Sequence, residues 1–107
     1  YQGALYSRTG VYYAVFGFDC ALRLFSKKSG SQEFIWGTGK TVKTKADCNC
    51  RLELQTGDGN LVIYDGDGKV LWAISKYGGD RLVMQNDGNL VVYDGGKAIW
   101  ASGTVGK

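Results

Sequence analysis

The sequence lacks histidine and proline altogether, and it contains one methionine and three cysteines. Without histidine, and without a nucleophile that has a neighbouring base, acid–base and covalent catalysis have no candidate residues. No pair of carboxylates outside the turns is placed as a glycosidase requires. Three thiols without a histidine or a C-x-x-C spacing also disfavour zinc. We therefore expect no enzyme, no catalytic residues, no metal and no cofactor.

Long apolar runs and amphipathic stretches of helical length are missing too. No segment approaches the ~20 apolar residues of a membrane span, and neither an initiator methionine nor a leader-like segment is present. We expect a processed, secreted protein without a membrane span. The net charge of +3 is too small, and the basic residues too scattered, to indicate a nucleic-acid partner.

What the chain does contain is typical of a β-protein. Its 107 residues include 17 glycines, seven tyrosines and three tryptophans, among short alternating apolar runs. This composition predicts an all-β chain rich in turns. The length suits a single domain, residues 1–107.

Internal repetition divides the chain. Trp36, Trp72 and Trp100 each follow an Ile or Leu, and a strand that begins with Asp and ends with an aromatic residue precedes each of them, at residues 19–25, 58–64 and 87–93. The repeats cover roughly residues 1–45, 46–78 and 79–107. A unit of about 30 residues cannot bury its own apolar face, so we expect three copies around a common core. The tryptophans are expected in that core, rather than on the surface as platforms for sugar.

Residues 85–93 carry a polar cluster at the bend of a predicted hairpin. Asp87, Gly88 and Asn89 separate two apolar runs, which is the mark of two strands joined by a tight turn. In an extended backbone, alternate residues project from the same face. The face in question carries Gln85, Asp87, Asn89, Val91 and Tyr93.

These residues match all five defined positions of the pattern Q-x-D-x-N-x-V-x-Y, and the chain thereby resembles the bulb-type (monocot) mannose-binding lectins. The resemblance implies a β-prism II fold: three antiparallel sheet subdomains with pseudo-threefold symmetry. It also implies non-catalytic binding of α-D-mannose and high-mannose glycans. Asp87 and Asn89 would hold the axial 2-hydroxyl, Gln85 the 3-hydroxyl and Tyr93 the 4-hydroxyl, while Val91 packs on the ring carbons.

The second repeat has the same residue types with one residue too many. Its candidate site consists of Gln55, Asp58, Asn60, Val62 and Tyr64. The extra residue falls in the turn, at Thr56 or Gly57, where a glycine can absorb it as a bulge with positive φ. Whether this second site binds mannose is left open.

In the first repeat only Asp19 of the pattern remains. The other four positions hold Gly17, Ala21, Arg23 and Phe25. We expect no mannose binding here. The polar residues 26–33 form an enlarged turn, which we interpret as drift. The alternative function is a β-prism that binds a protein or a cell surface through this repeat, with mannose binding secondary or lost.

The family resemblance also implies a disulfide between Cys20 and Cys50. Closing a loop of ~30 residues would stabilise the fold by about 3–4 kcal/mol. Cys48 would then be a free or intermolecular thiol, and a Cys20 to Cys48 bond is the alternative. The expected partners are mannose-containing glycans and glycoproteins. By resemblance, a homodimer that exchanges its C-terminal strand, from residues 101–107, is expected as well.

Overall fold

The structure is a computed structural model that describes residues 3–17, 19–39 and 50–107. Regular secondary structure in these residues consists of strands alone. The strands are β1 (Gly3–Tyr6), β2 (Tyr12–Phe16), β3 (Leu22–Ser26), β4 (Glu33–Gly37), β5 (Arg51–Leu54), β6 (Leu61–Tyr64), β7 (Val70–Ala73), β8 (Arg81–Met84), β9 (Leu90–Asp94) and β10 (Lys97–Ala101). The prediction of an all-β chain is confirmed. Nothing in this part of the chain is a helix long and apolar enough to cross a membrane.

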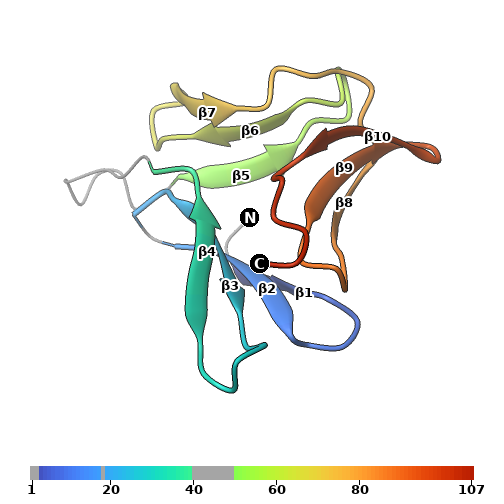
Figure 1. The fold of residues 1–107 in the computed structure, drawn as a ribbon. Coiled ribbons are helices and arrows are strands. Elements are labelled where there is room, and N and C mark those ends of the chain that lie inside the picture. Colours follow the sequence, from blue (N-terminus) through green and yellow to red (C-terminus); the bar gives the residue numbers. More distant parts are fainter. Residues whose placement is uncertain (1–2, 18, 40–49) are drawn as a thin grey trace.

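The strands form three antiparallel sheets, each from one continuous piece of chain. Their strand orders are β1-β2-β3-β4, β5-β6-β7 and β10-β9-β8. Figure 1 shows the three sheets arranged around a common centre. The last hairpin of each sheet has a register shift, between β3 and β4, between β6 and β7, and between β9 and β10. The three repeats therefore share their backbone geometry as well as their residue pattern.

Apolar residues at equivalent positions of the repeats form the core. The most deeply buried of them are Leu22, Leu24, Leu61, Ile63, Leu90 and Val92. Each repeat contributes two of these residues, two positions apart, so both lie on the inner face of the same strand. Trp36, Trp72 and Trp100 pack against this core and meet pairwise, edge to face, with ring centroids 5.7 to 6.0 Å apart. The prediction that they serve the core is confirmed.

A disulfide joins Cys20 to Cys50, with their Cα atoms 5.6 Å apart. It ties the residues before β3 to the start of β5, so it links the first two sheets. This pairing confirms the one that the family resemblance implied. Cys48 lies outside the described residues, and its free thiol stays a prediction.

Candidate functional site

The third repeat presents its polar cluster on the turn between β8 and β9. The backbone N–H of Gln85 donates to the backbone carbonyl of Asn89 at 2.9 Å, and the backbone N–H of Gly88 donates to the backbone carbonyl of Gln85 at 3.1 Å. Gly88 has φ +94°, and a Cβ there would lie 2.8 Å from the Thr104 carbonyl oxygen and 2.9 Å from the Tyr12 ring. Only glycine fits this position, because both the conformation and the space exclude a side chain.

Hydrogen bonds hold the polar side chains of this turn in place. The side-chain amide of Gln85 donates to the Tyr93 phenol oxygen. Asp87 Oδ1 accepts the Asn89 N–H at 2.9 Å. Asn89 Oδ1 in turn accepts the backbone N–H of Gly103 at 3.0 Å. In the described chain, Asp87 Oδ2 and Asn89 Nδ2 have no partner, so this turn offers one acceptor and one donor side by side.

The remaining residues of this site form its floor and one wall. Val91 is 2 % exposed and lies opposite Val83 on β8. It closes the floor but offers little surface of its own. The Arg81 guanidinium lies 4.8 Å from the centre of the Tyr93 ring, which fixes the ring by a cation–π contact. We call Gln85, Asp87, Asn89, Val91 and Tyr93 site three.

The second repeat brings the same groups together despite its extra residue. With the Gln55 amide turned so that its nitrogen faces Asp58, the nitrogen lies 2.9 and 3.1 Å from the two carboxylate oxygens, and its oxygen accepts the Tyr64 O–H. This orientation satisfies all three side chains, whereas the opposite one would direct a carbonyl at a carboxylate. Val62 is buried beneath them. We call Gln55, Asp58, Asn60, Val62 and Tyr64 site two.

Asn60 is held as Asn89 is. Its Oδ1 accepts the Ser75 N–H at 3.0 Å, and its own N–H donates to Asp58 Oδ1 at 3.0 Å. The residue is 8 % exposed, yet no buried side-chain nitrogen or oxygen of the described residues lacks a partner. Since no partner of Asn60 Nδ2 is found there, solvent reaches this nitrogen. Site two therefore also presents an amide donor beside a carboxylate, and Arg51 lies 4.4 Å from the centre of the Tyr64 ring.

The extra residue in site two is absorbed without a left-handed glycine at Gly57. Positive φ occurs instead at Gly59, with φ +73°, the position equivalent to Gly88. The expected bulge at Gly57 is therefore wrong in this detail. The insertion widens the turn between Gln55 and Asp58 but leaves their side chains in contact.

The first repeat has the same backbone turn, but different side chains contact one another on it. Its backbone bonds repeat those of the other turns: Gly17 N–H donates to the Ala21 carbonyl and Cys20 N–H to the Gly17 carbonyl, both at 3.1 Å. The Arg23 guanidinium lies on the Asp19 carboxylate, with Nη1 to Oδ1 at 3.1 Å and Nη2 to Oδ2 at 2.5 Å. A Cβ on Gly17 would lie 2.9 Å from Asp19 Oδ1, so the absence of a side chain there makes room for this pair.

This ion pair changes the chemistry of the position. The hydrogen bonds from Arg23 hold the pKa of the Asp19 carboxyl below its usual value, and the same bonds raise the pKa of Arg23. Arg23 contacts both carboxylate oxygens of Asp19, including the one that corresponds to the open Asp87 Oδ2 of site three. Ala21 supplies no amide, so the geometry supplies a physical reason for the expected loss of mannose binding.

A row of aromatic rings crosses the first sheet. Tyr6, Tyr13, Phe25 and Phe34 are neighbours in register on β1, β2, β3 and β4, and their centroids are 5.4 to 6.0 Å apart. From Tyr6 to Phe25 the rings are stacked face to face, while Tyr6 and Phe34 at the two ends of the row remain exposed. The row stabilises the sheet by cross-strand contacts.

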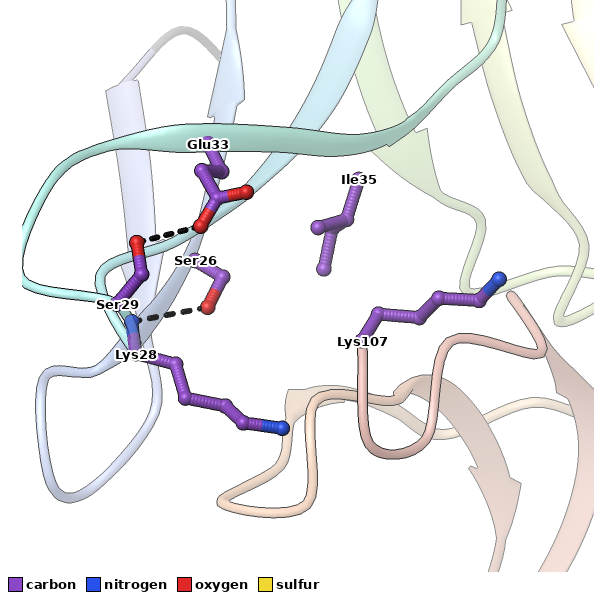
Figure 2. Close-up of a pocket in the computed structure, with 6 residues that line it drawn as sticks. All are labelled: Ser26, Lys28, Ser29, Glu33, Ile35 and Lys107. Atoms are coloured by element: carbon purple, nitrogen blue, oxygen red, sulfur yellow. Dashed lines mark hydrogen bonds between the residues drawn. The ribbon is translucent and has the colours of Figure 1, made fainter.

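The enlarged turn of residues 26–33 borders a small hollow, shown in Figure 2, with a volume of about 200 Å³. On one side Ser29 Oγ donates to Glu33 Oε1 at 2.5 Å. The Lys28 ammonium donates to the Gly106 carbonyl at 2.9 Å. The enlarged turn thus holds the C-terminal segment in place through the hydrogen bond from Lys28.

Solved structures resemble the chain over nearly its whole length. A lectin from Marasmius oreades has 32% sequence identity, covers 99% of this chain and 94% of its own, and superposes with a TM-score of 0.71. A monomeric monocot mannose-binding lectin from Gastrodia elata has 34% sequence identity, covers 96% of this chain and 93% of its own, and superposes with a TM-score of 0.73. The chain belongs to the bulb-type mannose-binding lectin family.

The family assignment settles the fold and the class of function. The mannose-specific agglutinin from snowdrop, Galanthus nivalis, solved with methyl-α-D-mannoside, has 29% identity, covers 95% of this chain and 91% of its own, and has a TM-score of 0.60. No protein-family model and no curated protein matches the sequence. The β-prism II fold is confirmed. As a bulb-type lectin, the chain is a carbohydrate-binding protein and not an enzyme.

Sequence reasoning missed two features of the sites. Residues 102–104 fix Asn89, and an arginine stacks on each binding-site tyrosine. The second feature has a signal in the sequence, because Arg51 and Arg81 begin equivalent strands of repeats two and three.

Proposed function

We propose that this lectin binds α-D-mannose, as the terminal residue of high-mannose glycans and glycoproteins, through site three and site two. The observation that carries the proposal is that both sites hold a carboxylate beside an asparagine whose oxygen is already bonded to backbone, at 3.0 Å in each. That bond turns the amide nitrogen into the available donor. The mannoside-bound snowdrop relative supports the same ligand.

The 2-, 3- and 4-hydroxyls of the sugar then each have a defined partner. The axial 2-hydroxyl of mannose donates to the Asp87 carboxylate and accepts from Asn89, while Gln85 and Tyr93 take the 3- and 4-hydroxyls. Glucose, with an equatorial 2-hydroxyl, would leave the Asp87 and Asn89 groups unmatched. Unmade hydrogen bonds to such groups are costly, so the site selects mannose over glucose.

Affinity for a single sugar is expected to be weak. Four hydrogen bonds at a net ~1 kcal/mol each correspond to a dissociation constant of roughly millimolar. Two sites on one chain raise the apparent affinity for a branched glycan that reaches both. Branched high-mannose glycans are therefore the ligands that the protein would hold in practice.

Secretion and dimerisation are proposed with this function. A disulfide is typical of oxidising compartments, which supports an extracellular location. A homodimer by exchange of residues 101–107 would have to release contacts that these residues make within the chain, among them Gly106 N–H to the Asp87 carbonyl at 2.8 Å. Analytical ultracentrifugation tests it: the dimer has twice the 11.6 kDa of the chain.

The function is tested by an amide-resolved NMR titration with methyl α-mannoside, with methyl α-glucoside as the control sugar. We expect shifts confined to residues 85–93 and 55–64, and none with the glucoside. Equal shifts with both sugars would contradict the proposed selectivity. No specific shift at tens of millimolar mannoside would overturn the function.

A further inference from the structure

Site three opens into a hollow that includes a residue from another sheet. The hollow has a volume of about 410 Å³ and is lined by Arg8, Val83, Met84, Gln85, Asn86 and Asp87. Arg8 lies in the turn between β1 and β2, and both of these strands contact β8. In Figure 1 this turn extends from the first sheet toward the third.

The turn that carries Arg8 is docked against site three. Thr9 N–H donates to Asn86 Oδ1 at 3.0 Å, across the two sheets. Within the turn, Gly10 N–H donates to the Ser7 carbonyl at 2.9 Å, and the buried Ser7 hydroxyl accepts the Tyr12 N–H at 3.1 Å. Arg8 therefore sits on a fixed support beside the sugar-binding groups.

The charge of Arg8 is available. Its side chain is exposed, and it makes no hydrogen bond or ion pair with any described residue. A guanidinium presents a planar set of N–H donors that matches a phosphate oxygen pair.

Site two has the opposite charge in the same place. Its hollow, of about 340 Å³, is lined by Glu53, Gln55, Thr56, Gly57 and Asp58. Glu53 lies opposite Val62, as Val83 lies opposite Val91, so Glu53 occupies the position of Val83, an apolar residue of the hollow beside site three. Each site has one arginine on its tyrosine. Site three thus combines two arginines with one carboxylate, whereas site two combines one arginine with two carboxylates, and Arg51 is paired with Glu53 there, Nε to Oε1 at 3.2 Å.

We propose that site three is a site for mannose that carries a phosphate on its anomeric oxygen, and that Arg8 is the residue that binds the phosphate. This inference rests on the proposed function. The 2-, 3- and 4-hydroxyls are used by the site, which leaves positions 1 and 6 for a substituent. The anomeric oxygen is adjacent to the 2-hydroxyl, and Asp87, one of the residues that hold this hydroxyl, lines the same hollow as Arg8.

The expected gain is modest, because Arg8 is exposed and its attraction is screened by salt. We expect α-mannose 1-phosphate to bind site three roughly three- to tenfold more tightly than methyl α-mannoside at low ionic strength. The preference should shrink in 0.5 M NaCl, about the range in which exposed charges are screened. At site two the phosphate should bring no gain, because Arg51 is already paired with Glu53 and no arginine of the described residues lines the hollow there.

The test compares dissociation constants from site-resolved NMR shifts at pH 7.5 for methyl α-mannoside, α-mannose 1-phosphate, mannose 6-phosphate and inorganic phosphate. The proteins are the wild type, Arg8→Gln and the matched control Lys69→Gln, which removes one exposed positive charge from the second sheet. We expect the 1-phosphate preference in the wild type and in Lys69→Gln, and its loss in Arg8→Gln. Mannose 6-phosphate should show no such preference.

Several results would overturn the inference while leaving mannose binding intact. These are equal affinity for mannoside and 1-phosphate at site three, a preference that survives Arg8→Gln, an equal preference for the 6-phosphate, or inorganic phosphate binding as tightly as the sugar phosphate. Absence of any mannoside shift would overturn the proposed function and this inference together.

Discussion

Arg23 occupies the acceptors of Asp19 at the position where, in the third repeat, Asp87 is left open. The two hydrogen bonds, at 3.1 and 2.5 Å, use both carboxylate oxygens. An arginine in place of the valine found at positions 62 and 91, together with Gly17 in place of a glutamine, therefore gives a closed ion pair where repeat three has a candidate ligand site. The backbone of the turn is the same in both.

The pH dependence of stability follows from this pair. Because the folded-state pKa of Asp19 is lowered, its contribution is present above the ordinary carboxyl pKa of ~3.9 and is lost as the pH falls through the lowered value. In Arg23→Val the Asp19 pKa, followed by carboxyl NMR, should rise toward ~3.9. Mannose binding should not appear, because Ala21 still lacks an amide. An unchanged Asp19 pKa would contradict the role of Arg23.

Cys20 adopts φ +69° where the other two repeats have the glycines Gly59 and Gly88. This left-handed conformation costs a non-glycine residue about 1–2 kcal/mol. In a Cys50→Ala background, Cys20→Gly should therefore be more stable than Cys20→Ala by about 1 kcal/mol, measured by urea unfolding. Both should be less stable than the disulfide-bonded protein by a few kcal/mol. Equal stability of the two variants would show that the conformation is not strained.

Asn89→Asp keeps the oxygen that the C-terminal segment binds and replaces only the amide nitrogen. The fold should be retained, since Gly103 can still donate to the remaining oxygen. Mannose affinity at site three should fall at least about tenfold, because the donor to the 2-hydroxyl is lost and a second negative charge is added. The matched variant Asn60→Asp should affect site two alone. Titration calorimetry of both variants, with NMR to identify the site, distinguishes these outcomes.

Site two should bind mannose more weakly than site three. Its Gln55 amide is bonded to Asp58, and the sugar must replace that contact, whereas Asp87 Oδ2 is already open. Deleting Gly57, which is exposed and has open space around it, shortens the turn to the length of site three. We expect this deletion to raise the affinity of site two toward that of site three. A deletion variant that folds but binds no better would show that turn length does not set the difference.

Thr104 links the C-terminal segment to the turn of site three. It is 3 % exposed, and its hydroxyl donates to the Gly88 carbonyl at 2.5 Å and lies 2.7 Å from Ser102 Oγ. Thr104→Val should destabilise the protein by about 1–2 kcal/mol, because it removes the hydroxyl that donates to the buried Gly88 carbonyl. Mannose affinity at site three should fall as well, since Asn89 is held by the same segment, while site two serves as the internal control. If affinity at site three stays at the wild-type level, the C-terminal segment does not contribute to mannose binding.

The all-β class, the three units and the membership of both candidate sites could be predicted from the residues because each depends on local, repeated spacing, whereas the β-prism II architecture came from the family resemblance. Alternation by two puts Asp87, Asn89 and Tyr93 on one face whatever surrounds them. The tryptophan spacing likewise indicates three units around one core. These features follow from spacing along the chain and need no knowledge of how the sheets meet.

Contacts between distant segments could not be predicted in this way. The bond from Gly103 to Asn89 depends on the path of the chain after β10, and the bond from Thr9 to Asn86 depends on how two sheets meet. The ion pair between Arg23 and Asp19 had a signal in the sequence, since the two residues have opposite charges and are four positions apart. Identifying it required knowing that Gly17 leaves space for the Asp19 carboxylate. The predicted thiol of Cys48 lies outside the described residues.

The tryptophan triangle gives the protein an optical signature of its own. Three indoles with centroids within 6.0 Å of one another, each contributed by a different sheet, exchange excitation and couple their transitions. Separation of any one sheet breaks two of the three pairs at once. Near-ultraviolet circular dichroism and fluorescence anisotropy therefore report closure of the prism as a single event, without any added label.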